Sequence, residues 1–438
     1  MLHGSLADKI LLFALPLAAT GILQQLFNAA DVAVVGQLVG SDAMAAVGSN
    51  APVIGLLVNL FVGISLGANV VLSRCTGQGD RGGISRGVHT AILVALFAGI
   101  LLAVTGILFS RPLLVLMGVP ESIFPMALAY LRIYMGGMPV ILLYNYESAV
   151  FRSQGDTRTP LFCLITAGIL NVCLNVVFIR VFHMTADGVA LATVVSNAVS
   201  AAMLLISLLR TEGPTRVRFR EFRIDVPLLK QMLAIGIPAG VQGMVFSLSN
   251  MSIQSSINSL GADVMAASSA SFNIEILVYF PVNAFGQACT TFIGQNTGAG
   301  QKERCRRVIR IALLMGAVSM VIFSTLLIVF RMPVLRLFNG EEAVIGYASA
   351  RLMAVLPFYF LDLIMELFSG AMRGFGKSLQ PALISLFGIC GTRLVWVHTY
   401  FRAHRDFPSL IAVYPISWAV TAAVLIICYL VMRRTLYR

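Results

Sequence analysis

The sequence predicts an all-α polytopic membrane protein whose twelve transmembrane helices form two six-helix lobes, related as parallel repeats, around a central cleft. Composition carries the first part of this prediction. Of 438 residues, 58% are hydrophobic and only 11% are charged, and the mean hydropathy is +0.88. Soluble domains carry about 25% charged residues, so a chain this poor in charge is expected to lie in a membrane. An internal duplication carries the second part, because doubled membrane units are the usual build of secondary transporters, whose substrate site lies between the halves.

The duplication consists of short motifs that return at a constant spacing of 221 residues. GSDAMAA at 40–46 returns as GADVMAA at 261–267, and TGQG at 76–79 returns as TGAG at 297–300. The same spacing matches three later residues of the first half with three of the second: Arg152, Gly155 and Pro160 with Arg373, Gly376 and Pro381. Self-similarity at a fixed period indicates a repeat, and here it covers nearly the whole chain.

Apolar stretches of about 20 residues, long enough to cross the hydrocarbon core, recur between short charged loops. The first half holds six, near residues 10–35, 43–72, 88–110, 126–150, 160–180 and 187–209. The second half holds six more, near residues 230–258, 264–293, 308–330, 343–370, 380–400 and 409–432. Because six is even, both halves enter the membrane with the same polarity, and we expect an axis along the membrane normal to relate them.

The basic residues predict the orientation of the chain, because Lys and Arg in short loops stay on the cytoplasmic side. With both termini cytoplasmic, the inside segments hold 22 basic residues and the outside loops six, with Arg132, Arg351 and Arg393 falling in spans. We therefore expect a multi-pass protein of the plasma (cytoplasmic) membrane with both termini in the cytoplasm. The net charge of +12 is then explained by orientation and by attraction to anionic membrane lipids.

The longest polar interruption runs from Arg210 to Lys230 and separates the two halves. We expect an N-terminal lobe at 1–209, a basic cytoplasmic linker at 210–229 and a C-terminal lobe at 230–438. The linker's alternating basic and apolar residues could lie against anionic headgroups, or the segment could be a solvated loop that sets the topology.

Several classes of protein are disfavoured. No basic patch is interleaved with aromatic residues, so a nucleic acid partner is not expected. The seven cysteines lack metal-binding spacing, so we expect free thiols and no cofactor. No nucleophile and base, or set of metal ligands, indicates an enzyme. The sequence GFGKS at 374–378 has Ala371 where a phosphate loop needs its first glycine, so the energy must come from an ion gradient or from the substrate's own gradient.

Acidic residues inside spans are the candidate functional residues, because burying a charge in hydrocarbon costs at least about 2.5 to 3.5 kcal/mol. Asp31 is the first candidate, since Gln24, Asn28 and Asp31 follow at i, i+4 and i+7 and share one helix face. Pro16 removes a backbone hydrogen bond upstream, so the helix can bend there. Protonation or cation binding at Asp31 would remove a charge and could switch the helix packing. Alternatively, Asp31 could pin a neighbouring helix through hydrogen bonds.

Neutral partners for Asp31 are available in the fifth and sixth spans, where Asn171 and Asn175 lie one turn apart and Thr193 follows. Such oxygens can coordinate Na⁺ or hold a protonated acid, so a sodium site at Asp31 is a second possibility.

The remaining acids in spans are Glu147, Glu275, Asp362 and Glu366. Asp362 and Glu366 lie one turn apart after Pro357 and repel each other when both are ionised, which favours handling of a proton or a cationic substrate. Pairing with Arg351 or Arg393 is the alternative for these two. Glu275, near Asn273, is a weaker candidate, and Glu147 is expected to form an ordinary ion pair with Arg152.

The combined motifs resemble the multidrug and toxic compound extrusion (MATE) family over essentially the whole chain. They are FNAADVAVVG at 27–36, DAMAAVG at 42–48, RSQGD at 152–156, GQNTGAG at 294–300 and RGFG at 373–376. The resemblance implies two six-helix lobes, an outward-open V-shaped cleft, and proton- or sodium-coupled export of organic, often cationic, compounds. It further implies that Asp31 is the family's first-helix carboxylate, Pro16 the kinking proline, Asn171, Asn175 and Thr193 the surrounding polar cluster, and Asp362 a second-lobe acid used by some members.

Two departures from the family pattern bear on the coupling ion. Asn175 stands where many relatives have a second aspartate, and Phe246 stands where another branch has a glutamate. With one formal charge at the first-lobe site, we expect a proton antiporter that exports amphipathic drugs or toxins, with Na⁺ as the alternative ion. Gln24, Asn28, Asp362, Glu366 and Glu275 are the candidates for substrate or second-lobe cation binding, and the protein is expected to function as a monomer. The alternative function is a flippase for lipid-linked precursors, which would need more Arg or Lys in the spans than the three found.

Overall fold

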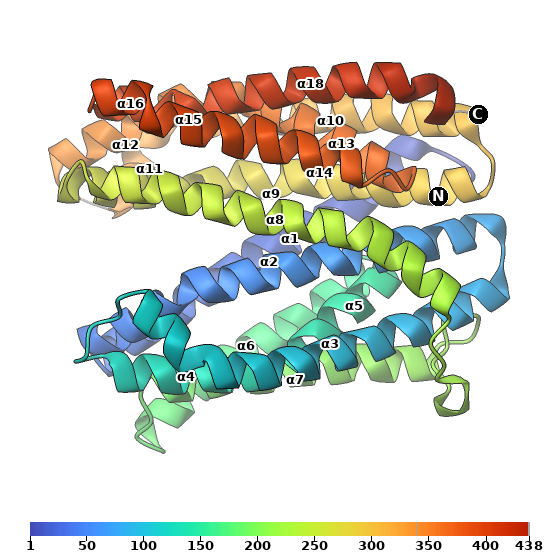
Figure 1. The fold of residues 1–438 in the computed structure, drawn as a ribbon, viewed down its shortest axis with the longest axis horizontal. Helices are drawn as coiled ribbons and strands as arrows, with labels where there is room; N and C mark the ends of the chain where they lie inside the picture. The colour runs from blue at the N-terminus through green and yellow to red at the C-terminus, as the bar shows by residue number, and fades with distance from the viewer. Residues whose placement is uncertain (339, 437–438) are drawn as a thin grey trace. The chain divides into compact units, whose positions relative to one another are not determined.

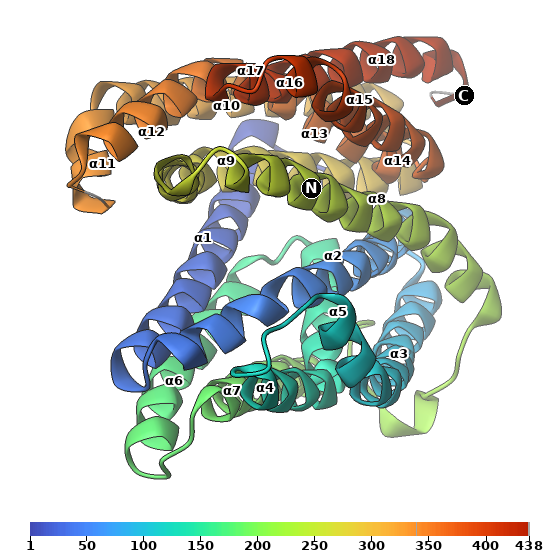
Figure 2. The same cartoon turned by 60° about the vertical axis from the view of Figure 1, so that its left-hand side comes forward.

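The computed structural model describes residues 1–338 and 340–436, and the ordered elements of that range are all helices (Figures 1 and 2). Eleven of these helices are long and apolar enough to cross a membrane, and a pair bent by 47° (Phe124–Gly136 with Met138–Gln154) gives a twelfth span in the described residues. The predicted all-helical membrane fold with twelve spans is confirmed.

The chain divides into two compact units. One comprises Ala19–Gly236 and is called here the N unit; the other comprises Met1–Ala18 together with the chain from Ile237 onward and is called the C unit. Both boundaries fall inside a helix, each within two residues of a proline: Pro16 in α1 (Leu6–Leu38) and Pro238 in α8 (Val226–Asn258). The predicted division at 210–229 stays a prediction.

The N unit is built from the later part of α1, six further α-helices, one short 3₁₀ helix and the beginning of α8. The six are α2 (Ser41–Gln78), α3 (Arg81–Leu116), α4 (Phe124–Gly136), α5 (Met138–Gln154), α6 (Arg158–Arg180) and α7 (Ala186–Arg210), followed by the 3₁₀ helix η1 (Phe219–Glu221). Helix α5 packs against α2, α3 and α7, and α6 packs against α7.

The C unit contains the first turns of α1, the later part of α8 and a series of helices with more interruptions. They are α9 (Ala262–Gly298), α10 (Lys302–Val329), α11 (Arg331–Phe338), α12 (Glu342–Val355), η2 (Leu356–Phe358), α13 (Tyr359–Gly374), α14 (Leu379–Ser385), η3 (Leu386–Gly391), α15 (Thr392–His398), α16 (Tyr400–Ala403), α17 (Phe407–Ile411) and α18 (Val413–Leu436). Pro357 lacks an amide hydrogen and lies in the 3₁₀ turn that breaks the predicted 343–370 span. The predicted 380–400 span is interrupted by the π-helical turn η3.

Three pairs of glycines mark the same boundaries in both halves of the duplication. Gly40 and Gly261 precede α2 and α9 with φ of 128° and 108°. Gly79 and Gly300 follow the same two helices at φ of 70° and 69°, and Gly155 and Gly376 follow α5 and α13 at 93° and 71°. Only glycine adopts these conformations without strain, so the repeated glycines end repeated helices.

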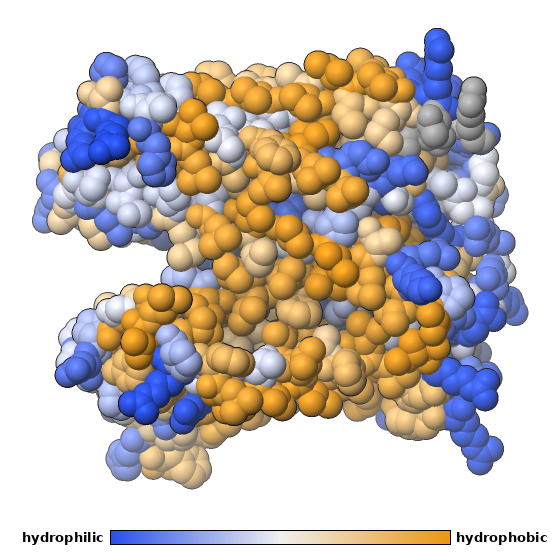
Figure 3. All heavy atoms as spheres, in the orientation of Figure 1, coloured by the Kyte–Doolittle hydropathy of each residue, from blue (hydrophilic) through white to orange (hydrophobic). Residues whose placement is uncertain are grey.

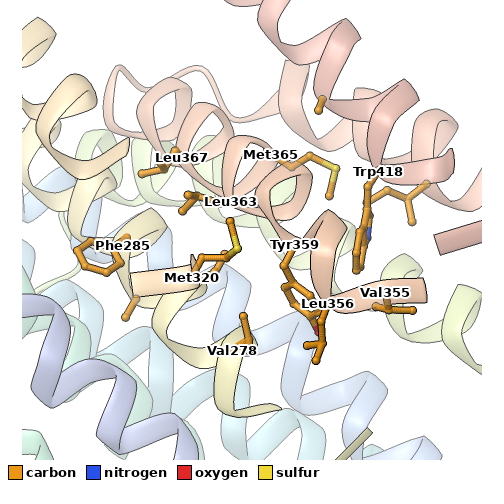
Figure 4. Packing of buried hydrophobic residues seen from close by; sticks show 14 of the residues in the cluster. Val278, Phe285, Met320, Val355, Leu356, Tyr359, Leu363, Met365, Leu367 and Trp418 are labelled. Carbon is orange, nitrogen blue, oxygen red and sulfur yellow. The ribbon is translucent and has the colours of Figure 1, made fainter. Parts of the chain in front are cut away.

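The core of the C unit surrounds α9, which packs on α10, α12 and α13. Figure 4 shows Phe285 of α9 and Met320 of α10 close to Leu363 and Leu367 of α13, while Trp418 of α18 lies beside Tyr359 with ring centroids 5.1 Å apart. In each unit, hydrophobic side chains gather over the middle of the helices and hydrophilic ones toward their ends, the pattern expected of helices that cross a bilayer (Figure 3).

The segment between α7 and α8 is docked on α3 of the N unit. The Arg218 amide donates to His89 Nε2 at 2.9 Å, the Asp225 amide donates to Thr90 Oγ1 at 3.0 Å, and Arg86 pairs with Asp225 at 2.9 Å. Val217 is buried in the same unit. These contacts hold parts of the linker against α3, while Arg216, Arg218 and Arg220 are exposed, so the solvated-loop interpretation stays a prediction.

Candidate functional site

Asp31 is buried in the N unit and is surrounded by the neutral polar groups that the sequence singled out. Asn175 Nδ2 of α6 donates to Asp31 Oδ1 at 2.6 Å, and Thr193 Oγ1 of α7 lies 3.2 Å from Asp31 Oδ2. Asn171, one turn before Asn175, lies 3.4 Å from both Asn175 and Thr193. The four side chains thus form one hydrogen-bonded cluster from three helices.

Local sequence explains why these helices meet here. Asn171 and Asn175 share a face because they lie one turn apart on α6. On the same helix Gly168 lies against Phe27 of α1, and a Cβ at Gly168 would overlap the Phe27 ring. The missing side chain lets α1 approach α6 closely enough for Asp31 to reach Asn175.

The cluster holds the carboxyl group without a cationic partner. Among the described residues, Asp31 accepts hydrogen bonds from the neutral side chains of Asn175 and Thr193. The Thr193 hydroxyl is within reach of a second acceptor, the Val189 carbonyl at 2.9 Å. A hydroxyl has one hydrogen and two lone pairs, so Thr193 can donate to a carboxylate, or donate to Val189 and accept from a protonated Asp31. The site can therefore bind both forms of the acid without repacking.

Other predicted residues of the first span lie elsewhere along α1. Pro16 is inside the helix, in the turns that belong to the C unit. Gln24 and Asn28 are exposed, so of the predicted polar face only Asp31 is enclosed in the hydrogen-bonded cluster. The sequence analysis missed Tyr130 and Tyr134 of α4, which interact electrostatically with Asp31. The available signal was that two polar hydroxyl groups occur within an apolar span.

The second-lobe acids Asp362 and Glu366 both lie on α13. Asp362 is buried and its Oδ2 has no hydrogen-bond partner in the described residues, while Glu366 pairs with Arg373 at 3.8 Å. Neither acid lies within 4.0 Å of Arg351 or Arg393 in the described part of the chain, so the alternative ion pairs do not form. Arg393 does interact electrostatically with Asp362.

Glu275 of α9 forms a buried ion pair with Arg351 of α12. Both carboxylate oxygens accept from the guanidinium, at 2.8 and 3.0 Å, which is the bidentate geometry that arginine favours. Arg351 also lies over the ring of Tyr414. Arg393 lies over the same ring, 4.8 Å from its centroid. In this state Glu275 is bound to Arg351 and is less available to a cation than Asp362.

Arg393 was not among the predicted site residues, although it is almost fully buried in α15. It donates to Asn250 Oδ1 at 2.7 Å and to Ser417 Oγ at 3.3 Å and stacks on Phe246. A basic residue within a span was the signal that the sequence offered.

Glu147 also differs from expectation: no ion pair with Arg152 forms, and neither of its oxygens has a hydrogen-bond partner in the described residues.

Known proteins resemble this chain over nearly its whole length. The family model MatE matches residues 16–177 and 238–397, one segment in each half of the duplication. Probable multidrug resistance protein YoeA of Bacillus subtilis is 30% identical over 391 residues, which cover 87% of this chain and 84% of that protein. The FAD transporter of Shewanella oneidensis is 27% identical over 370 residues, covering 82% and 80%.

A crystal structure of a MATE in complex with MaL6 has the same fold. It superposes with a TM-score of 0.92 at 21% identity and covers 99% of this chain and 98% of that one. The family match in both halves, together with the relatives and the shared fold, confirms the resemblance drawn from the sequence motifs: the chain belongs to the MatE family of transporters.

Proposed function

We propose that the protein is a secondary antiporter that exports organic, often cationic and amphipathic compounds in exchange for protons, with Asp31 as the coupling residue. The observation that carries the proposal is the buried Asp31 carboxyl, held by Asn175 and Thr193 without a basic partner. An acid in this setting gains or loses its charge when a proton binds or leaves, and no existing ion pair has to break. Family membership and relatives named as multidrug resistance proteins support export of small organic molecules.

The hydrogen bonds around Asp31 favour a proton over Na⁺. Asn175 turns its Nδ2 donor toward Asp31, whereas a sodium ion would need oxygen atoms directed at it. The hydrogen-bonded cluster also contains a single acid, Asp31, beside the neutral Asn171, Asn175 and Thr193. Both features favour a proton, and sodium coupling is the alternative that the vesicle experiment below tests.

The basic residues of the spans favour a cationic or neutral substrate over an anionic lipid headgroup. Arg351 is neutralised by Glu275. Arg132 contacts the Ser110 hydroxyl at 3.3 Å, so Arg132 and Arg393 are the two basic residues of the spans without a carboxylate within 4.0 Å among the described residues. A flippase for anionic lipid-linked precursors would need a larger basic surface. The similarity to an FAD transporter makes an anionic dinucleotide the compound to include as a comparison.

Transport into everted vesicles under an imposed ΔpH or ΔNa⁺ tests the proposal. We expect uptake of an ethidium-like cation to follow ΔpH, and Asp31→Asn to reduce that uptake about 5- to 150-fold, the range of typical coupling energies. Asp42→Asn, which neutralises an exposed acid of the same unit, is the matched control and should transport normally. Uptake driven only by ΔNa⁺ would contradict the proton assignment, and normal export by Asp31→Asn would remove Asp31 from the mechanism.

A further inference from the structure

Glu147 of α5 is an acidic side chain that the mechanism above does not use. Its exposed fraction is 0%, and both carboxylate oxygens lack a hydrogen-bond partner in the part of the chain that the structure describes. The other acids within spans all have neighbours that stabilise a charge or interact with one. Asp31 has Asn175 and Thr193, Glu275 has Arg351, Glu366 has Arg373, and Asp362 interacts with Arg393. Glu147 is therefore the exception.

An ionised carboxylate with no partner is the most expensive group that a membrane protein can bury, and a bound proton removes most of that cost. Buried polar atoms without a protein partner are normally satisfied by water. In the structure as it stands, the surroundings of Glu147 suit a neutral carboxylic acid. A carboxyl group of this kind can release a proton and take one up.

The helices packed around α5 bring few groups that compete for that proton. Cys163 of α6 is a buried thiol, a weaker acid than a carboxyl group. On α3, the ring nitrogens of His89 are hydrogen-bonded to the Ser85 carbonyl and the Arg218 amide. Helix α2 carries Arg74 and Cys75 near its C-terminal end. The titratable groups of α7 are Asp187 and Arg210 at its two ends, and Arg152 of α5 itself donates to the Ser148 carbonyl.

Glu147 and the Asp31 cluster lie toward opposite ends of the N unit. Glu147 is seven residues, about 10 Å, from the end of α5 at Gln154. Helix α6 starts from that same side at Arg158, and Asn175 lies seventeen residues, about 26 Å, along it. Because the sequence predicts that the α5–α6 loop is cytoplasmic, Glu147 lies between the Asp31 cluster and the cytoplasm.

A row of hydroxyl groups on α7 covers about 10 Å of the roughly 16 Å between these two depths. Ser196 and Ser200 follow Thr193 at i+3 and i+7, so the three hydroxyls share a face. Thr193 contacts Asp31, Ser196 Oγ contacts the Thr193 carbonyl at 3.0 Å, and Ser200 Oγ has no partner in the described residues. Helix α7, which carries this row, packs directly against α5, which carries Glu147.

We propose that Glu147 is the second proton-carrying carboxyl group of the N unit and passes the proton from Asp31 toward the cytoplasm along the α7 hydroxyls and water. In each cycle Glu147 releases its proton to cytoplasmic water, and the carboxylate that remains takes up the proton that Asp31 gives up. One proton enters from outside and one leaves, each relay hydroxyl or water gives up one O–H bond as it gains another, and no net bond change remains after the cycle. The inference rests on the proposed proton antiport.

Glu147→Gln in reconstituted protein tests this role, because glutamine keeps the size of the side chain but cannot carry a transferable proton. We expect ΔpH-driven export to fall about 5- to 150-fold. Counterflow, the exchange of labelled for unlabelled substrate without net proton movement, should remain close to wild type. Glu147→Asp should recover part of the ΔpH-driven export, and Glu121→Gln, at an exposed acid before α4, serves as the control.

A Glu147→Gln protein that exports normally under ΔpH would overturn the inference, since a merely structural acid tolerates this change. If Asp31→Asn also exports normally, the proposed function itself fails; if Asp31→Asn is inactive, only the role of Glu147 fails. Should Glu147→Gln not fold, labelling of the wild-type protein by dicyclohexylcarbodiimide decides, because this reagent modifies protonated carboxyl groups in apolar surroundings. Modification of Glu147 that decreases as the pH rises would support the role, and absent or pH-independent modification would overturn it.

Discussion

The chemistry of the Asp31 site depends on which hydrogen-bonding groups are neutral. Asn175 and Thr193 can satisfy a carboxylate, but neither adds a charge that would lock Asp31 in the ionised form. Thr193 has the more adaptable role, because its hydroxyl lies within reach of both Asp31 Oδ2 and the Val189 carbonyl. A single hydroxyl can thus follow the protonation state of the acid by changing the acceptor to which it donates.

Replacement of Thr193 tests this adaptability. Thr193→Val keeps the shape of the side chain but removes the hydroxyl, and a lost hydrogen bond to a charged group costs about 1.5–3 kcal/mol. We expect the ionised form of Asp31 to be destabilised and ΔpH-driven transport to fall about tenfold or more. Thr193→Ser retains the hydroxyl and should transport nearly as well as wild type. Equal activity of the two variants in vesicle uptake would show that the hydroxyl is not needed.

Packing between helices α9 and α13 depends on small residues. A Cβ at Gly370 of α13 would overlap the carbonyl oxygen of Gly286 of α9, and one at Gly374 would crowd the carbonyl of Thr290. Lipid tails give no hydrophobic force that drives helices together, so close backbone approach of this kind supplies much of the attraction between them. The same helix α13 carries Asp362 and Glu366, and its position against α9 therefore determines where these acids lie.

Gly370→Ala tests the close approach. The added methyl group must push α13 away from a backbone atom, so we expect the free energy of unfolding to fall by about 1–3 kcal/mol. Gly346→Ala in α12 is the matched control, because nothing lies within 4 Å of the position of its Cβ. There the substitution should stabilise the helix by about 0.5–1 kcal/mol. Thermal unfolding of the detergent-purified proteins measures both, and a Gly370→Ala protein as stable as the control would contradict this account.

The sequence predicted the spans well because each is bounded by charged or glycine-containing loops, as at Gly79 and Gly155. It also selected the members of the Asp31 cluster, since polar residues are rare in apolar helices and those at one-turn spacing share a face. It was wrong about Glu147 and Arg152, which are close in sequence but do not meet. It did not anticipate the Arg351–Glu275 pair, because it considered Arg351 as a partner for Asp362 or Glu366, and the choice among these acids depends on how the helices pack.

At the scale of the whole molecule, the distribution of basic residues predicts that both termini and the α7–α8 linker are cytoplasmic. Green fluorescent protein fused to the C-terminus should therefore fluoresce, and alkaline phosphatase at the same place should be inactive. Alkaline phosphatase inserted after residue 118, between α3 and α4, should be active, because this loop is predicted to lie outside. The opposite pattern of activities would invert the topology, and with it the direction in which Glu147 would pass a proton.

The position of the first helix has a consequence for synthesis of the protein. The first 18 residues belong to the C unit, where Phe13 packs edge-on against Phe292 of α9 with ring centroids 5.8 Å apart. These two rings leave the ribosome far apart in time, and contacts so distant in sequence form late. Residues 1–18 must therefore remain without their final neighbours until the C unit has been translated, so a C-terminal half produced alone would lack part of its own core.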